Sequence, residues 1–283
     1  MAQQLELIPL NPVASPFLKW AGGKTQLIKQ FKQLFPPKFE RYIEPFVGGG
    51  AVFFHLFSFG RIREARLSDN NEELINCYQV VKTDVSELIS LLKTHQKRHT
   101  EDYYYHMRSL QPIDLCPVER AAQTLYLNKT CFNGLYRVNR KGQFNVPIGS
   151  YENPTICNED ALTAASRALE NVTIFHADFE ECTNTAQTND FVYLDPPYSP
   201  ISETANFTQY TKDGFSGKDQ QRLATVFEQL TTKNCYAMLS NSDCEPIRQL
   251  YHNHHIETVR AKRAINSKAT ARGAIGEIVV RNY

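Results

Sequence analysis

Residues 190–198, DFVYLDPPY, are the stretch of sequence that decides the fold. The apolar run at 191–194 is rich in residues that favour β-structure, so it predicts a buried strand. Two prolines follow Asp195, and neither can extend a β-ladder or a helix. Because ligands of open α/β sheets bind beyond the carboxyl ends of the strands, we expect Asp195, Pro196, Pro197 and Tyr198 to lie where the chemistry occurs.

The turn after this strand offers hydrogen-bond acceptors rather than donors. Pro196 and Pro197 lack an N–H group, which leaves the Asp195 carboxylate and main-chain carbonyls as its polar groups. Tyr198 adds a flat aromatic face. Such a turn suits a planar group that carries an amino group, because the acceptors take the amino protons and the nitrogen lone pair then faces an electrophile. A buried strand with an ordinary proline-rich turn is the alternative.

The composition is that of a globular protein without strong bias. The 283 residues are 42% hydrophobic with a net charge of +1, so any surface for nucleic acid must be local. The seven cysteines form no C-x-x-C pair, which argues for reduced thiols without a disulfide framework or zinc cluster. Three histidines near residue 254 lack the spacing of a metal site, and no metal is expected. Without an apolar signal core or a membrane-length run, we expect a cytoplasmic protein.

Residues 41–60 predict the opening of a nucleotide-binding unit. A strand at 41–44 leads into the glycine turn EPFVGGG and then into a helix at 51–59 that Gly60 closes. The turn is not G-x-G-x-x-G, so a pyrophosphate is not the expected ligand. A second strand, at 65–68, ends at Asp69, about 20 residues beyond the turn, where an acid can bind a ribose diol. The alternative is that Asp69 caps the following helix. Together the turn and the acid favour an adenosine-type cofactor without a diphosphate.

Two other segments carry candidate ligands. FLKWAGGKT at 17–25 precedes a predicted helix at 27–35, but a phosphate loop needs a glycine where Leu18 stands, so an ATPase is disfavoured. We expect Trp20 and Lys24 to face a ligand at a helix N-terminus, although Trp20 could be ordinary core. After a strand at 172–175, Asp178 could accept a hydrogen bond from an adenine amino group beside Phe179, or be a plain loop acid.

Residues 73–165 predict an inserted helical subdomain, because no strand alternates with its helices. Within it, 135–138 and 143–146 could pair as a hairpin. Segment 128–147 contains four cations and no acid, interleaved with aromatic and Asn residues. Cations hold phosphates, Arg and Asn read base edges, and aromatics wedge between bases, so this segment predicts a DNA contact; a solvated hairpin is the alternative. A lid at 199–214 and a second basic surface at 258–276 are further predictions.

Taken together, the motifs resemble those of the Dam-type DNA adenine-N6 methyltransferases. FLKWAGGK, EPFVGGG, LSDNN, NGLYRVN and DFVYLDPPY occur in the family's order, nearly end to end. The resemblance implies an α/β fold, with a class I methyltransferase Rossmann-like sheet, helices on both its faces, and an inserted, mainly helical target-recognition subdomain with a β-hairpin. The catalytic domain would comprise 1–72 and 166–283, and the inserted domain 73–165.

The resemblance also implies S-adenosylmethionine as cofactor, S-adenosylhomocysteine as product and double-stranded DNA as partner, with the protein a monomer or weak dimer on DNA. The target would be a flipped adenine within GATC. The expected catalytic residues are Asp195, Pro196, Pro197 and Tyr198. The expected cofactor-binding residues are Trp20, Ala21, Gly22, Gly23, Lys24, Glu44, Pro45, Phe46, Gly48, Gly50, Asp69, Asn70, Asp178, Phe179 and Asp195. The expected DNA-binding residues are Lys19, Asn133, Leu135, Arg137, Asn139, Lys141 and Pro147.

Three other functions are compatible with the same sequence motifs. A methyltransferase that acts on RNA or on a glutamine side chain could share the acceptor turn, and so could one that acts on cytosine N4. A catalytically inactive DNA-binding module is the third, although the acids Asp69, Asp178 and Asp195 argue against it.

Overall fold

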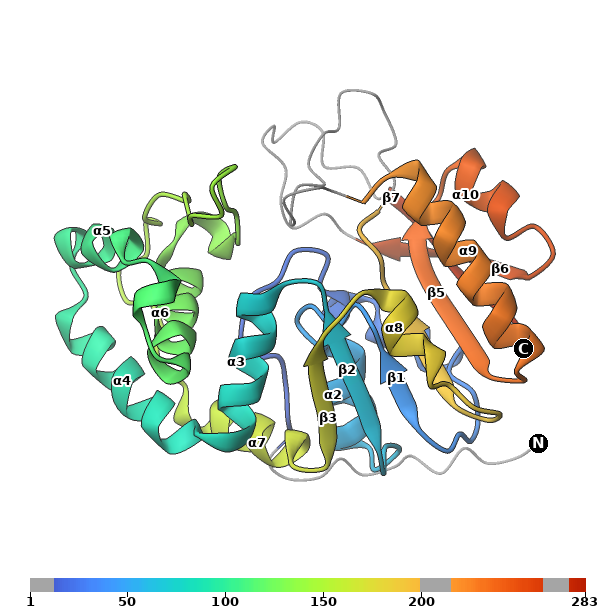
Figure 1. The fold of residues 1–283 in the computed structure, drawn as a ribbon, viewed down its shortest axis with the longest axis horizontal. Coiled ribbons are helices and arrows are strands. Elements are labelled where there is room, and N and C mark those ends of the chain that lie inside the picture. Colours follow the sequence, from blue (N-terminus) through green and yellow to red (C-terminus); the bar gives the residue numbers. More distant parts are fainter. Residues whose placement is uncertain (1–12, 199–214, 262–274) are drawn as a thin grey trace.

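A computed structural model describes residues 13–198, 215–261 and 275–283 of the chain. Its centre is a seven-stranded sheet with the order β3-β2-β1-β4-β5-β7-β6 (Figure 1). The strands are β1 Tyr42–Glu44, β2 Ala65–Asp69, β3 Val172–His176, β4 Phe191–Leu194, β5 Tyr236–Ser242, β6 His255–Ala261 and β7 Ile275–Arg281. The first five run parallel, and β7 runs antiparallel to both β5 and β6. The predicted strand at 191–194 is confirmed and lies at the middle of the sheet.

Strand β4 shows why the sheet is covered on both faces. All four of its residues are buried, as expected for a central parallel strand. Successive side chains of a strand point to opposite faces, and Phe191 and Tyr193 accordingly belong to one hydrophobic cluster while Val192 and Leu194 belong to another. The apolar run therefore joins the two cores of the protein.

Helices cover each of these clusters. The first cluster is covered by α1 Ile28–Phe31, α2 Ala51–Ser58, α3 Glu72–Thr83 and α7 Glu159–Leu169. The second is covered by α8 Phe179–Asn184, α9 Gly217–Thr232 and α10 Glu245–Leu250. Figure 1 shows α8 and α9 in front of the sheet and α2 behind it. The predicted α/β fold with helices on both faces is confirmed.

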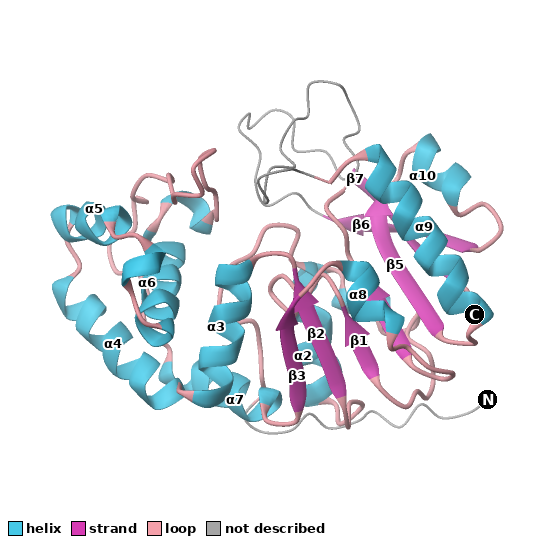
Figure 2. Cartoon of the chain, viewed as in Figure 1, coloured by secondary structure: helices cyan, strands magenta, loops and turns pink. Residues whose placement is uncertain are grey.

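The insert between β2 and β3 is helical, as predicted. Besides α3 it contains α4 Val85–Arg98, α5 Glu101–Ser109 and α6 Pro117–Thr130, which Figure 2 shows at one end of the sheet. Helix α3 packs against α6 and α7 and also against β2 and β3, so it joins the insert to the sheet. Arg120 of α6 strengthens this contact with ion pairs to Glu72 and Glu73. The domain boundary at residue 73 stays a prediction.

Two local predictions need correction. Of the helix predicted at 27–35, only the short α1, Ile28–Phe31, forms; a 3-10 turn, Lys24–Gln26, precedes it and turns follow it. Pro36 cannot donate to a helix and disfavours helical geometry at Phe35, so the helix cannot extend to the predicted end. The predicted hairpin forms one bridge, Val138 to Phe144, rather than two strands. Its turn is closed by Asn139, whose Oδ1 accepts from the N–H groups of Lys141 and Gln143 at 2.9 and 3.0 Å.

The predicted lid at 199–214 and residues 262–274 of the predicted basic segment lie outside the described residues. Among the helices that are described, none is long and apolar enough to cross a membrane.

Candidate active site

Three acids gather where neighbouring parallel strands end. Glu44 ends β1, Asp69 ends β2 and Asp195 follows the last residue of β4. Because β2, β1 and β4 are adjacent in the sheet, these side chains lie together at the carboxyl ends of the strands, where α/β proteins bind ligands.

Asp195 forms an ion pair with Lys24. Lys24 Nζ lies 2.8 Å from Asp195 Oδ1, and Lys24 is only 5% exposed. The ammonium group also donates to the Gly22 carbonyl at 2.6 Å. Burial raises the pKa of Asp195 to about 6, although Lys24 opposes this rise and Glu277 adds to it. The sequence analysis named both residues, and the structure pairs them although they come from segments far apart in the chain.

Asp69 holds the glycine turn rather than the following helix. Its Oδ2 accepts from the Gly48 N–H at 3.1 Å and its Oδ1 from the Asn71 N–H at 3.0 Å. The N-cap of α3 is Asn71, whose Oδ1 accepts from the Leu74 N–H at 2.9 Å, so the helix-cap alternative for Asp69 is wrong. Burial raises the pKa of Asp69 to about 6.

Glu44 is the most deeply buried of the three acids, at 2% exposure. The Tyr42 hydroxyl donates to its Oε2 at 2.9 Å. Burial raises the pKa of Glu44 well above its usual range, and the charges of Asp195 and Asp69 add to this. The carboxyl ends of these strands therefore favour binding of a positively charged group.

The glycine turn is packed against aromatic side chains of this chain. Gly48 and Gly50 both have positive φ, +47° and +69°. A Cβ on Gly48 would lie 2.9 Å from Trp20 Cδ1, and one on Gly50 would lie 2.6 Å from the Tyr78 hydroxyl oxygen. Glycine is thus required at both positions for conformation and for space.

Three phenylalanines form an aromatic cluster beside the acids. The rings of Phe46 and Phe179 stack with centroids 5.4 Å apart, and Phe215 contacts both. Arg222 of α9 lies over Phe179 with 4.7 Å to the ring centroid. It also donates to Asp178 Oδ1 at 2.9 Å, while this carboxylate accepts from the Glu180 N–H as the N-cap of α8. The sequence reasoning named Phe46, Phe179 and Asp178 but missed Phe215 and Arg222.

The acceptor turn is fixed by polar side chains from three elements. The Tyr198 hydroxyl donates to Glu277 Oε2 at 2.6 Å, and Lys24 Nζ lies 4.7 Å from the centre of the Tyr198 ring. Gln220 donates to the Pro197 carbonyl at 3.2 Å, and Asn241 donates to Gln220 at 3.0 Å. Gln220, Asn241 and Glu277 were missed, since a sequence gives no sign of which distant side chain meets a turn.

The other predicted residues of the two glycine-containing loops lie close to these groups. Gly23 donates to the Trp20 carbonyl at 3.2 Å and closes the turn that contains Ala21 and Gly22. Pro45 is buried between Glu44 and Phe46, and Asn70 is exposed after Asp69.

The predicted DNA-contacting segment is attached directly to the loop that carries Lys24. The Trp20 ring lies 5.0 Å from the Tyr136 ring. Asn128 of α6 binds the main chain of Lys19 on both sides, accepting from its N–H and donating to its carbonyl at 2.8 Å each. A Cβ on Gly134 would come within 2.4 Å of the Lys19 side chain. Figure 1 shows segment 131–150 on the side where the parallel strands end.

Most predicted DNA-contacting side chains are at the surface. Asn133, Arg137, Lys141 and Pro147 are exposed, Asn139 lies in the turn, and Leu135 is half-buried against the core. Arg137 is oriented by Asn145, whose Oδ1 accepts from Arg137 Nε at 2.7 Å. Phe132, which was not in the predicted set, is 50% exposed.

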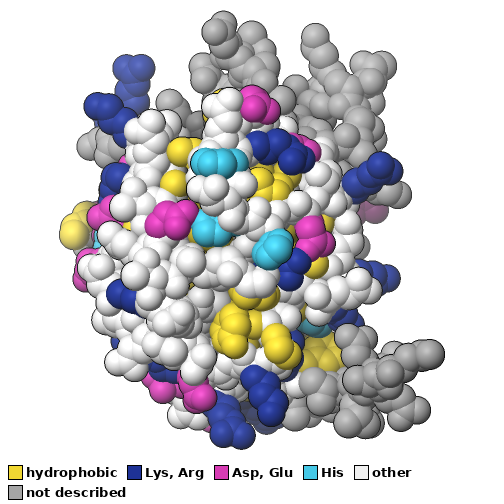
Figure 3. Space-filling model, turned by 90° about the vertical axis from the view of Figure 1, so that its right-hand side faces the viewer, with side chains coloured by type: hydrophobic (Ala, Val, Ile, Leu, Met, Phe, Trp, Pro, Cys, Tyr) yellow, Lys and Arg dark blue, Asp and Glu magenta, His cyan; other side chains and the backbone are white. Residues whose placement is uncertain are grey.

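No group of three or more His, Cys, Asp or Glu in the described part of the chain could hold a metal ion. His254 instead contacts Glu228, with 2.6 Å between Nε2 and Oε1. Figure 3 shows the face at the far end of the sheet from the helical insert, where separate histidine side chains lie among charges of both signs.

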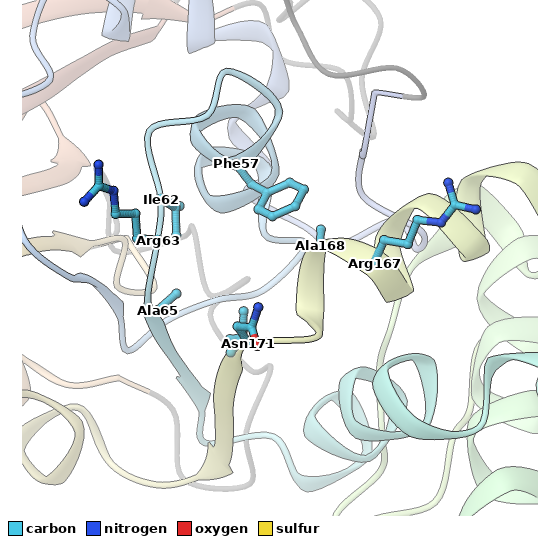
Figure 4. A pocket seen from close by; sticks show the side chains of 8 residues that line it. Phe57, Ile62, Arg63, Ala65, Arg167, Ala168 and Asn171 are labelled. Carbon is cyan, nitrogen blue, oxygen red and sulfur yellow. The ribbon is translucent and has the colours of Figure 1, made fainter.

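A small cavity of about 120 Å³ lies at the other end of the strands from these acids (Figure 4). It is lined by Phe57, Ile62, Arg63, Ala65, Arg167, Ala168, Asn171 and Val172. Ala65 and Val172 begin β2 and β3, so this cavity is at the amino ends of the strands. Figure 4 shows the guanidinium groups of Arg63 and Arg167 directed away from it. It is therefore unsuited to a nucleoside-sized ligand.

The fold and the acidic strand ends define an α/β protein of the class I methyltransferase type. The chain belongs to the family of D12 class N6 adenine-specific DNA methyltransferases, whose model matches residues 20–265. It is 45% identical over 274 residues to a Type II methyltransferase of Lactococcus lactis subsp. cremoris, covering 95% of each chain. A Type II methyltransferase of Methanocaldococcus jannaschii is 44% identical, with 95% of this chain and 99% of that protein covered. The DNA adenine methylase of Serratia marcescens is 36% identical, with 93% and 96% covered. The family resemblance inferred from the motifs is confirmed.

Proposed function

We propose that this protein methylates N6 of an adenine in double-stranded DNA, with S-adenosylmethionine as methyl donor and S-adenosylhomocysteine as second product. We further propose that the adenine lies within GATC and rotates out of the duplex before it reacts. Family membership supports DNA adenine as the substrate. The observation that carries the proposal is the turn after β4, in which Asp195 and the Tyr198 ring both contact Lys24 and the Pro197 carbonyl accepts from Gln220.

The buried acids support S-adenosylmethionine. The pKa values of Glu44, Asp69 and Asp195 are all raised because burial disfavours the carboxylate anions. A ligand with positively charged sulfonium and ammonium groups would stabilise these anions, whereas a triphosphate would be repelled. When bound, S-adenosylmethionine supplies an electrophilic methyl group.

We assign the ribose hydroxyls to Asp69 and the adenine ring of the cofactor to the aromatic cluster. The carboxylate of Asp69 already accepts from two main-chain N–H groups, which fixes its orientation for further hydrogen bonds. Phe46 and Phe179 offer flat apolar surface. Asp178 is 44% exposed, so it is free to exchange Arg222 for the adenine amino group.

The reaction would then need no covalent intermediate. The target adenine must leave the stack, because N6 cannot be reached inside a duplex. The Asp195 carboxylate and the Pro196 carbonyl would accept its two amino hydrogens, and the Tyr198 ring would support the base. Holding both hydrogens aims the nitrogen lone pair at the methyl group for in-line attack. Positioning and preorganised electrostatics would supply most of the acceleration.

We assign DNA contact to segment 131–150 together with Lys19. The exposed cations Arg137 and Lys141 can reach phosphates or base edges. The exposed ring of Phe132 can enter the space that an extruded base leaves. The tight contact between Gly134 and Lys19 keeps these groups on one surface.

Mapping of modified bases tests the proposal. Duplex DNA that contains every tetranucleotide is incubated with the protein and labelled S-adenosylmethionine, and the nucleosides are then identified. We expect N6-methyladenine within GATC only; N4-methylcytosine, or label in RNA or protein but not in DNA, would overturn the assignment. The variant Asp195→Ala should lose transfer. Asp160→Asn, an exposed acid in the first turn of α7, is the control and should keep it.

A further inference from the structure

Glu277, in the antiparallel strand β7, contacts Tyr198 of the proposed active site. Its Oε2 accepts from the Tyr198 hydroxyl at 2.6 Å across 79 residues of sequence. Glu277 lies in β7, where it is paired with Ser242 of β5 on one side and with Val259 of β6 on the other. Because both neighbours hold its main chain, the Cα of Glu277 is fixed relative to the sheet, and its carboxylate can hold Tyr198 from there.

Tyr198 has no comparable anchor in its own turn. The two residues before it are prolines without an N–H group. Gln220 holds the Pro197 carbonyl, which fixes the main chain of the turn and leaves the Tyr198 side chain free to rotate. Around its ring, the described residues provide two polar contacts: Glu277 at the hydroxyl, and Lys24 Nζ at 4.7 Å from the ring centre. Lys24 itself is held by Asp195 and by the Gly22 carbonyl. The orientation of the ring is therefore set by a cation near the ring and an acid at its far end.

We propose that Glu277 is a positioning residue for the target base: by accepting the hydrogen bond from the Tyr198 hydroxyl, it fixes the plane on which the extruded adenine stacks. This inference rests on the proposed function. Glu277 does not touch the reacting atoms. Without it, the Tyr198 side chain can turn away from the stacking orientation, so fewer extruded bases reach the geometry in which N6 meets the methyl group.

A different role for Glu277 is electrostatic, since its charge acts on Asp195. The two roles respond differently to amide substitution. Glu277→Gln keeps an oxygen that can accept from Tyr198 and removes the charge, whereas Glu277→Ala removes both. Retention of activity in the amide variant therefore identifies the hydrogen bond as the cause.

A double-mutant cycle on the full-length protein tests the inference. Glu277→Ala, Tyr198→Phe and the double variant are compared for kcat and for the KM of DNA at saturating S-adenosylmethionine. We expect about a tenfold loss of kcat for each single variant, in line with the loss of a charge-assisted hydrogen bond, and no further loss for the double variant. Glu277→Gln should stay within about threefold of the wild type. Glu257→Ala, on the neighbouring strand β6 where the residue pairs with Arg281, is the matched control.

A second readout reports the base directly. DNA with 2-aminopurine at the target position becomes brighter when that base leaves the stack, and Glu277→Ala should change this emission while the affinity for S-adenosylmethionine stays unchanged. Additive losses in the cycle, or equal damage from Gln and Ala, would overturn the proposal. If the wild type methylates no DNA adenine, the proposed function fails. The Glu277–Tyr198 contact is then still tested by the same cycle in urea unfolding, where additive effects would refute it.

Discussion

Replacing Lys24 by Met should shift the acid limb of the pH–activity profile toward higher pH. In the wild type, burial raises the pKa of Asp195 to about 6 even though the ammonium group of Lys24 lies 2.8 Å away and lowers it. An opposite charge this close lowers a carboxyl pKa by about 1 to 3 units. Its removal should therefore raise the pKa of Asp195 to between about 7 and 9.

The consequence at neutral pH is large. With a pKa of about 6, about nine-tenths of Asp195 is ionised at pH 7, whereas a pKa between about 7 and 9 leaves between about one-half and one-hundredth ionised. If the ionised carboxylate accepts the amino hydrogen, activity at pH 7 falls by this ratio, and it recovers as the pH rises.

The assay is kcat/KM for S-adenosylmethionine between about pH 5 and pH 10 at saturating DNA, because this quantity reports pKa values of the enzyme before the cofactor binds. Loss of a contact between Lys24 and the cofactor would lower the whole profile without moving it along the pH axis. Lys24→Arg keeps the charge and is the control. The reasoning is refuted if the acid limb of Lys24→Met coincides with that of the wild type.

Three further predictions follow from other contacts. Asp190→Ala should lower the free energy of unfolding by about 1 to 3 kcal/mol, measured by urea denaturation. Arg41 loses the carboxylate that it binds at 2.6 Å and keeps the Thr185 carbonyl and Glu64 as partners. A loss below about 0.5 kcal/mol would contradict this. Arg137→Ala should relax the choice of sequence more than it lowers kcat, measured by mapping methylated sites; unchanged specificity with a smaller salt dependence would make Arg137 a phosphate contact. Chelators should leave methylation unchanged, since the proposed transfer relies on positioning by a carboxylate, a carbonyl and an aromatic ring; loss of activity that added metal restores would refute this.

The central strands could be predicted because burial on both faces gives each of them a short run of apolar residues. β4 is fully buried, and so its sequence is a continuous apolar run. β6 was missed because it lies at the edge of the sheet: its described side chains are mostly exposed, with Val259 the buried exception. α8 and α10 are six residues each, too short to show a helical period. In α5, consecutive tyrosines hide the period, since Tyr104 is buried whereas Tyr105 is exposed.

The residues of the site also divide into those that a local sequence pattern indicates and those that it does not. Acids such as Asp69 and Asp195 could be found because each stands at the carboxyl end of a strand, and the topology of a parallel sheet brings these ends together. Their partners could not be found in this way. Arg222 reaches Asp178 across 44 residues and Glu277 reaches Tyr198 across 79, and nothing in the local pattern of either residue indicates a contact. Such pairs depend on side-chain packing between elements, which is fixed only when the whole chain folds.

The electrostatics of the strand ends also explain why Gly-Lys-Thr at 23–25 is not a phosphate loop here. Its lysine is directed to Asp195 and the Gly22 carbonyl, and so its charge is already compensated. For Asp195, a folded-state pKa of about 6 against a usual value of 3.8 means that stability is fully present at low pH and falls by about 3 kcal/mol as the pH rises through 6. A second anion would add to this cost, whereas a bound cation would reduce it. The charges at the carboxyl ends of these strands thus favour a positively charged ligand, independently of any contact with its nucleoside.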